Sequence, residues 1–480
     1  MTRAYFSIAP EAVPELEGRI DAIADELEVR QGFSPEVLAE AEAAAGQVDL
    51  PALDRTDLPL LTIDPPGAKD LDQAMFIERS GDGWTVHYAI ADVVSYVRPG
   101  GAVDAEAHRR GQTLYAPSRR IPLHPPALSE DAASLLPEVV RPAVLWSIDL
   151  DADGRQRDVR VERARVRSTA QLDYEGVQAQ VEAGRGPETL ALLREVGERR
   201  EALEAERGGV SLPLPSQEIE RAADGSWSLT YRQLLLSEGW NEQISLMTGM
   251  AAAGLMLEAE VGLVRTLPPA DEHGLRRLRR AARGLGIEWP ADMAYPELVR
   301  TLDPTLPHHL AMLDACTGLL RGAGYVAFDG DAPADAEAEH SAIAAPYAHA
   351  TAPLRRLADR YVSEVCLAVS GGSEVPAWAR EGLVALPDVM GATGRVASRF
   401  DRAVLDLVEA VVLSDAVGRS FGGVVIDADD KDPAKGSILL DDPAVEAPVV
   451  GTAPLPLGEL VRVTLEEADV DARSVRFRLA

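Results

Sequence analysis

The chain has 480 residues, of which 46% are hydrophobic and 26% charged, and it carries a formal net charge of −31. This balance predicts a soluble globular protein of two or three domains and excludes fibrous and disordered classes. Two cysteines exclude a disulfide scaffold, and the absence of a leader-like or membrane-spanning apolar run predicts a cytoplasmic protein without membrane attachment.

Two helices are predicted in a helical N-terminal region, residues 1–55. Residues 15–30 carry apolar side chains at helical spacing. Ser34 followed by Pro35 predicts the start of a second helix, which runs to residue 45. The region is interpreted either as a small helix-turn-helix-like module or as a helical lead-in that packs on the main domain.

Strands dominate the next segment, and helices follow them. Residues 84–91 and 144–150 are rich in β-branched and aromatic residues, which is typical of strands. Helical periodicity then appears at residues 189–206, 233–264, 355–370 and 394–417. Strands followed by helices predict an α+β domain over residues 56–416.

The C-terminal part, residues 417–480, has a different pattern. Short strands are predicted at residues 421–426, 437–440, 460–465 and 474–479, with Gly, Pro and Asp turns between them. About five short strands in this length predict a small closed barrel.

The net charge argues at face value against a nucleic-acid partner, because binding a polyanion needs local positive charge. Electrostatic attraction of a charged partner depends, however, on where the charges lie on the protein and not on the net charge. Arginine, which binds phosphate bidentately, clusters at residues 109–110, 119–120, 163–167, 276–283 and 355–356. A nucleic-acid partner therefore stays open.

Three aspartates lie close together in the sequence LTIDPPGAKDLDQAM: Asp64, Asp70 and Asp72. Like charges at this spacing repel, so such a cluster usually indicates a bound cation. In extended backbone Asp70 and Asp72 face the same side, and the Pro-Pro-Gly turn folds Asp64 toward them. Mg²⁺ prefers such oxygens and supports phosphoryl chemistry. A solvated acidic turn is the alternative interpretation.

The surrounding motifs are more specific. The segment TIDPPGAKDLDQA is followed by VHYAIADVVSYVRPG, RRGQTLYAPSRRIPLHPPALSEDAASL and ATAPLRRLADRYV. In this order and spacing they resemble the RNB catalytic domain of the ribonuclease II / ribonuclease R family, which are hydrolytic 3′-to-5′ exoribonucleases. The tail GELVRVTLEEADVDARSVRFRLA is similar to the family's C-terminal OB-fold RNA-binding domain. The resemblance implies a mixed β-sheet with surrounding helices, followed by an OB-fold barrel.

The resemblance also implies a site for Mg²⁺, with Mn²⁺ as a substitute. Asp64, Asp70 and Asp72 match the first three aspartates of the family pattern D-x5-D-x-D-D. Gln73 stands at the fourth position, where its neutral carbonyl oxygen supplies less charge to a metal. The implied catalytic residues are Asp70, Asp72 and Arg355, and Arg355 binds the scissile phosphate.

Four further residues are implied RNA contacts. Tyr115 matches the tyrosine that stacks on the 3′-terminal base, and Tyr174 matches a sugar- or base-contacting tyrosine. Glu242 aligns with a glutamate near the terminal nucleotide, and Arg356 is placed to reach a different phosphate from Arg355. The phenylalanine that often completes the family's base sandwich is absent, because the segment here reads VSLPLPSQ.

We therefore expect a monomeric, Mg²⁺-dependent exoribonuclease that degrades single-stranded RNA from its 3′ end and releases nucleoside 5′-monophosphates. Too few residues precede the RNB-like region for the family's N-terminal cold-shock domains, so a short form is expected. One alternative is a catalytically weakened RNA-binding protein with a degenerate metal site at Gln73. Another is a scaffolding protein whose acidic surface binds basic partners.

Overall fold

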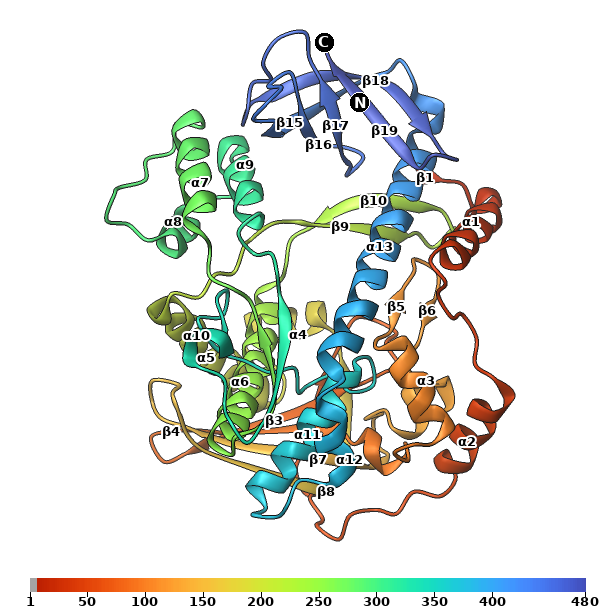
Figure 1. Cartoon of the computed structure of the whole chain (residues 1–480), viewed down its shortest axis with the longest axis vertical. Coiled ribbons are helices and arrows are strands. Elements are labelled where there is room, and N and C mark those ends of the chain that lie inside the picture. Colours follow the sequence, from red (N-terminus) through yellow and green to blue (C-terminus); the bar gives the residue numbers. More distant parts are fainter. Residues whose placement is uncertain (1–6) are drawn as a thin grey trace.

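The computed structural model describes residues 7–480 and contains two β-barrels at opposite ends of the molecule. The long helix α13 (Leu386–Leu413) runs from the N-terminal barrel to the C-terminal one (Figure 1). Both α-helices and β-strands are abundant, so the predicted α+β class is confirmed.

The first barrel is a closed, mixed sheet of five strands in the order β2-β3-β4-β7-β8. Its strands are β2 (Leu60–Ile63), β3 (Gln73–Ser80), β4 (Gly83–Ala91), β7 (Val140–Leu150) and β8 (Gln156–Leu172). Antiparallel pairs join all neighbours except β2 and β8, which pair in parallel and close the barrel. Tyr88 and Trp146 are fully buried in its core, in adjacent strands and in register with each other.

Helices cover this barrel and complete its core. α5 (Glu188–Arg207), α6 (Leu236–Glu258) and α11 (Leu357–Ser370) contribute buried residues to the same hydrophobic cluster as the strands. The predicted helix over 233–264 is wrong at its C-terminal end. The chain turns at Glu260, which has a positive φ of 56°, and Val261–Thr266 forms strand β11, paired with β12 (Gly324–Asp329).

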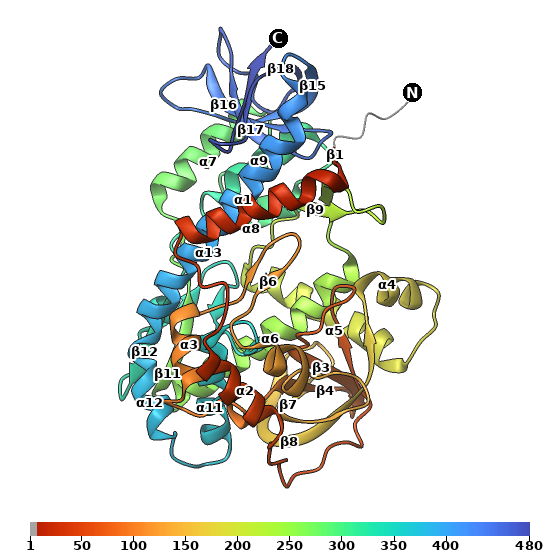
Figure 2. The same cartoon turned by 90° about the vertical axis from the view of Figure 1, so that its right-hand side faces the viewer.

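The two N-terminal helices pack on different parts of the molecule. α1 (Val13–Glu26) shares a hydrophobic cluster with α13 and the C-terminal barrel, and Figure 2 shows it crossing α13. α2 (Pro35–Ala45) packs against α3 (Ala102–Arg110), where Glu40 accepts hydrogen bonds from the first two backbone N–H groups of that helix. The two helices therefore do not share a core.

The C-terminal barrel is also closed, with the strand order β15-β16-β17-β19-β18. Its strands are β15 (Ser420–Ala428), β16 (Lys435–Leu440), β17 (Glu446–Val450), β18 (Leu460–Asp469) and β19 (Ser474–Leu479). A parallel pair, β17 with β19, closes it around Phe477 and Val449. The predicted OB-fold barrel is confirmed, and β17 is the strand that its sequence did not indicate.

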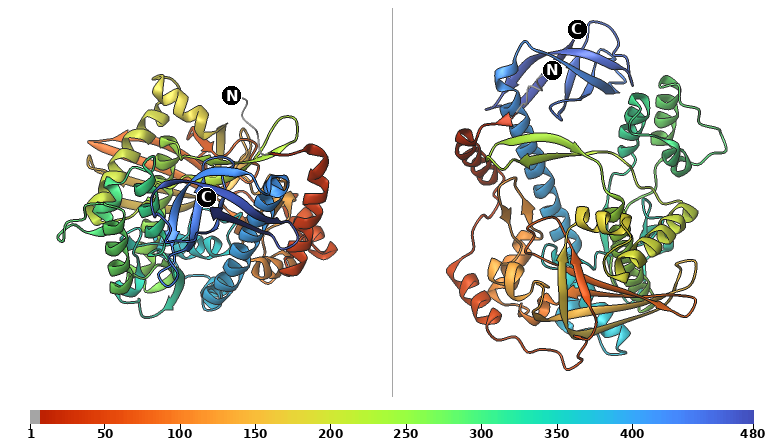
Figure 3. Two further views of the ribbon diagram at one scale, coloured as in Figure 1. Left: turned by 90° about the horizontal axis from the view of Figure 1, so that it is seen from above. Right: turned by 180° about the vertical axis from the view of Figure 1, so that it is seen from behind.

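The space between the barrels is bridged by β9 (Ser216–Arg221) and β10 (Trp227–Arg232), which form a sheet with β1 (Ser7–Ile8) (Figure 3). Three further helices, α7 (Glu272–Gly284), α8 (Tyr295–Thr301) and α9 (Pro307–Thr317), lie beside the C-terminal barrel. The remaining β-strands and α-helices are β5 (Leu114–Tyr115), β6 (Arg120–Ile121), α4 (Tyr174–Glu182), α10 (Asp335–Ala338), β13 (Glu339–His340), β14 (Ala345–Pro346) and α12 (Ala377–Leu383). Across residues 7–480 no helix combines the length and apolarity needed to cross a membrane.

Candidate active site

A cavity of about 760 Å³ opens where β2 ends and β3 begins. The turn between these strands forms one wall, and the β5–β6 hairpin and the start of α4 form others. Its lining includes seven predicted site residues: Asp64, Asp70, Asp72, Gln73, Tyr115, Tyr174 and Arg355. Glu242 and Arg356 lie outside this lining.

The acidic turn is fixed by local chemistry. Gly67 adopts a φ of +79°, a conformation that favours glycine, and so lets the chain fold back after Pro65 and Pro66. Ser134 holds the segment that follows the turn, since its hydroxyl donates to the Lys69 carbonyl at 2.6 Å and accepts from the Leu71 N–H at 3.0 Å. The carboxylates are therefore presented by an ordered loop.

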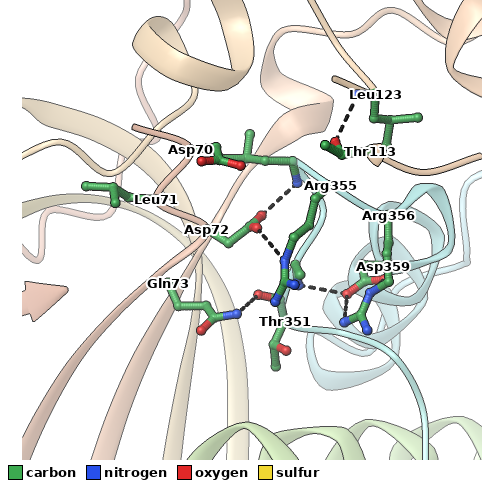
Figure 4. Close-up of polar contacts among 12 residues, drawn as sticks. Asp70, Leu71, Asp72, Gln73, Thr113, Leu123, Thr351, Arg355, Arg356 and Asp359 are labelled. Atoms are coloured by element: carbon green, nitrogen blue, oxygen red, sulfur yellow. Dashed lines mark hydrogen bonds and ion pairs between the residues drawn. The ribbon is translucent and has the colours of Figure 1, made fainter. Parts of the chain in front are cut away.

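Asp72 is the most constrained of these acids and is 3% exposed. Its Oδ1 accepts a 2.7 Å hydrogen bond from the Leu354 N–H, and its Oδ2 lies 3.4 Å from Arg355 Nε (Figure 4). Burial raises the pKa of the Asp72 carboxyl to about 7, against the opposing positive charge of Arg355.

Asp64 provides an open ligand position. Its Oδ2 is buried and has no hydrogen-bond partner among residues 7–480. Burial raises the pKa of this carboxyl to about 6. A cation would stabilise such an oxygen, so the donor chemistry of Asp64 and Asp72 fits a hard divalent ion such as Mg²⁺.

Asp70 has a different partner. Its carboxylate forms an ion pair with Arg120, and its second oxygen lies 3.5 Å from the Tyr115 hydroxyl. In the described part of the chain, no three His, Cys, Asp or Glu side chains are grouped so that they could hold a metal. The expected convergence of three carboxylates is thus not met here. Asp70 and Asp72 do not lie in a strand, because β3 begins only at Gln73, so their i, i+2 spacing does not place them on one side.

Gln73 uses both ends of its amide. Its Nε2 donates to the Thr351 carbonyl at 2.6 Å (Figure 4). Its Oε1 accepts from the Tyr88 hydroxyl at 2.8 Å. The side chain therefore ties β3 and β4 to the loop before α11. A metal would have to use the remaining lone pair of Oε1.

The two neighbouring arginines have distinct surroundings. The Arg355 side chain is 45% exposed and lines the cavity, so it is placed to bind an incoming anion. Arg356 forms a two-point ion pair with Asp359, at 3.1 and 2.9 Å, and Asp359 also accepts from the Ala352 N–H. Arg356 therefore stabilises the loop, and this geometry does not support its predicted contact with a second phosphate.

The cavity also has exposed aromatic surface. Tyr115 is 47% exposed, and Tyr174, the first residue of α4, lines the cavity. Two other lining residues, Ile219 of β9 and Arg120, were not predicted as site residues. The β9 sequence carries no local signal for this placement. The arginine pair at 119–120 did signal a phosphate-binding cluster, but nothing in it singled out Arg120. Leu212 and Leu214 belong to the segment VSLPLPSQ, where the family often has a phenylalanine that contacts a base. Both leucines pack on the α7–α9 helices.

Comparison with known proteins agrees with these features. Residues 53–370 match the RNB domain family, and residues 419–480 match the RNase II-type exonuclease C-terminal S1 domain. Ribonuclease R of Vibrio parahaemolyticus is 28% identical over 421 residues, covering 80% of this chain and 48% of that protein. A probable exosome complex exonuclease RRP44 of Caenorhabditis elegans is 30% identical over 355 residues, covering 70% of this chain and 36% of the relative.

Among solved structures, Mycoplasma genitalium RNase R in complex with ribose-methylated single-stranded RNA has the same fold. It superposes with a TM-score of 0.85 at 18% sequence identity, covering 97% of this chain and 78% of that one. The chain spans about half the length of the Vibrio relative, or less in the case of RRP44. The RNB match alone covers well over half of the chain, which therefore belongs to the RNB-domain family of ribonuclease II and ribonuclease R.

Proposed function

We propose that the chain is a hydrolytic 3′-to-5′ exoribonuclease that uses Mg²⁺ or Mn²⁺ and releases nucleoside 5′-monophosphates. One observation carries the proposal. A single cavity, within the region that matches the RNB family, brings together two buried carboxyls, Asp64 and Asp72, and an exposed arginine, Arg355. Acid–cation pairs of this kind are suited to phosphodiester hydrolysis.

Each residue has a distinct role in this mechanism. The exposed ring of Tyr115 stacks on the terminal base, which tolerates any base and suits an enzyme without sequence preference. Arg355 binds the scissile phosphate and stabilises the charge that develops as the bond to the 3′ oxygen breaks. The Leu354 N–H and Arg355 orient the Asp72 carboxylate and favour its ionised form, in opposition to burial, which raises its pKa to about 7.

Asp64 and Asp72 are the residues that would hold a divalent metal. When bound, such an ion supplies an activated water and polarises the phosphoryl oxygen. The names of the relatives, ribonuclease R and exosome exonuclease, support RNA as the substrate, as does the RNA bound in the Mycoplasma structure. We further propose that the chain acts as a monomer in the cytoplasm.

The test is digestion of single-stranded RNA in Mg²⁺, in Mn²⁺ and in EDTA, with the RNA labelled at its 5′ end to follow shortening and labelled internally to identify the released nucleotides. We expect progressive shortening from the 3′ end in either metal, with nucleoside 5′-monophosphates as the product on thin-layer chromatography. EDTA should stop the reaction. Intact RNA in every divalent ion tested would overturn the proposal.

A second candidate is an RNA-binding protein without catalysis. It is favoured by the neutral Gln73 at the fourth acidic position and by the ion pair that occupies Asp70. The same experiment separates the two, because this candidate predicts salt-sensitive RNA binding without any shortening.

A further inference from the structure

Arg120 lies in the cavity but has no role in the mechanism above. It is the first residue of β6 and pairs across the hairpin with Tyr115 of β5. Its guanidinium forms an ion pair with one oxygen of Asp70, whose other oxygen approaches the Tyr115 hydroxyl. One hairpin thus presents both an aromatic ring and a cation to the same predicted metal ligand.

The base of this hairpin is tied to the segment that carries Arg355. The Thr113 N–H donates to the Arg355 carbonyl at 3.0 Å, and the Leu357 N–H donates to the Gly111 carbonyl at 2.9 Å. The Thr113 hydroxyl in turn accepts from the Leu123 N–H at 3.0 Å (Figure 4). Arg120 and Arg355 are therefore held on the walls of one cavity.

The ion pair opposes metal binding at Asp70. The guanidinium occupies one oxygen of the Asp70 carboxylate, and its positive charge repels a second cation that approaches the same carboxylate. Asp64, by contrast, has a buried oxygen without a partner among the described residues. Asp70 is thus the one of the three acids whose carboxylate is paired with Arg120.

We propose that Arg120 is a phosphate-binding residue that exchanges partners when RNA enters. In the RNA-free protein it holds Asp70, and when the terminal nucleotide stacks on Tyr115 its guanidinium moves to an RNA phosphate. Phosphate offers arginine the same two-point geometry as a carboxylate. The released Asp70 then joins the metal site.

The exchange rests on the proposed exoribonuclease function and goes beyond it, because it makes metal and RNA binding mutually supportive. RNA that displaces Arg120 from Asp70 strengthens metal binding, and a metal that displaces Arg120 from Asp70 strengthens RNA binding, because such coupling is reciprocal. Each nucleotide that enters would thereby assemble its own metal site.

The test compares Arg120→Gln with Arg119→Gln. Arg119 is a matched control because it lies on the same hairpin but pairs with Asp21 and Gln31. Mn²⁺ affinity is measured by electron paramagnetic resonance without RNA, and RNA affinity by fluorescence anisotropy in EDTA. Thermal melting checks that each variant is folded.

We expect Arg120→Gln to bind Mn²⁺ about three- to tenfold more tightly than wild type, because Asp70 is freed. The same variant should bind RNA about three- to tenfold more weakly. The slope of its log affinity against log salt concentration should fall by about one, the value for one phosphate contact. Arg119→Gln should leave Mn²⁺ affinity unchanged. A purely structural Arg120 would instead weaken both affinities.

Unchanged Mn²⁺ affinity in Arg120→Gln would overturn the exchange, and so would unchanged RNA affinity. If Arg120→Gln does not fold, Arg120→Lys decides: it keeps the charge but loses the two-point contact, so weaker RNA binding supports the proposal and wild-type RNA binding overturns it. Neither assay requires turnover. A wild-type protein that leaves RNA intact would therefore refute the proposed function, while the Mn²⁺ and RNA affinities of the Arg120 variants would still test the exchange.

Discussion

The backbone N–H of Leu354 donates a 2.7 Å hydrogen bond to Asp72 Oδ1, although the two residues lie 282 positions apart in the sequence. The next residue, Arg355, places its Nε 3.4 Å from the other oxygen of the same carboxylate. One loop thus supplies a neutral donor and a cation to a buried acid. Both contacts favour the ionised carboxylate, which burial alone would disfavour.

Asp72→Asn tests this carboxylate directly. Asparagine keeps the shape and the acceptor for the Leu354 N–H but removes the charge. We expect RNA hydrolysis to fall by at least about a hundredfold, while RNA affinity measured in EDTA stays within about twofold because no phosphate contact is lost. Single-turnover cleavage of 5′-labelled RNA and anisotropy measure the two quantities. Wild-type turnover would show that another group performs the chemistry.

Arg355 and Arg356 give a paired prediction, because one faces the cavity and the other is tied to Asp359. Arg355→Lys should reduce cleavage about tenfold or more with little change in stability, since lysine lacks the guanidinium fork. Arg356→Lys should lower the free energy of unfolding by about 1–3 kcal/mol, because it weakens a pair with a buried aspartate.

Urea unfolding and cleavage rates at saturating RNA separate the two arginine effects. The opposite pattern, with Arg356→Lys folded normally but inactive, would restore Arg356 to the phosphate-binding role that its sequence position indicated.

Much of the fold follows from local signals. The Ser34 side chain accepts from the Val37 N–H at 3.3 Å, so the predicted start of α2 has the expected physical basis. The C-terminal strands alternate with turn residues, so their positions also follow from local sequence signals. Closure of the first barrel was not predictable, because the parallel pairing of Leu61 with Ala170 joins segments that are far apart in the sequence.

The site shows the same division. All four residues of the acidic motif, Asp64, Asp70, Asp72 and Gln73, line one cavity. The partners that decide how two of these positions behave come from elsewhere: Arg120 for Asp70, and Tyr88 and Thr351 for Gln73. No spacing within the motif encodes these contacts, so they required the folded chain.

Gln73→Asp restores the fourth acid of the family pattern. We expect the Mg²⁺ concentration that gives half-maximal cleavage to fall, because a further carboxylate adds charge to the site. In EDTA the variant should lose about 1–3 kcal/mol of stability, since the Thr351 carbonyl loses its donor and a like charge is added near Asp72. Mg²⁺ titrations and urea unfolding measure these effects.

The control for Gln73 is Tyr88→Phe, which removes the hydrogen bond to Gln73 Oε1 without adding charge. It should lower stability and leave the Mg²⁺ requirement unchanged. An unchanged or higher requirement in Gln73→Asp would mean that position 73 does not reach the metal.

The buried acids predict how stability depends on pH in the metal-free protein. The pKa of Asp72 is raised by burial from 3.8 to about 7, and that of Asp64 to about 6. Between these values and 3.8 the folded state binds protons that the unfolded state has lost. The unfolding free energy therefore falls as pH rises from about 4 to about 7.

Asp72→Asn removes the largest part of this slope, because asparagine has no proton to lose. In EDTA at pH 8 the variant should be more stable than wild type by roughly 1–3 kcal/mol, and the difference should shrink as pH falls toward 4. Mg²⁺ at pH 8 should stabilise wild type more than the variant, since it binds the ionised acid. Urea unfolding at several pH values between about 4 and 8 measures this difference. If the unfolding free energies of the two proteins changed with pH in parallel, ionisation of Asp72 would cost no folding free energy, and a metal would not be needed to stabilise its buried charge.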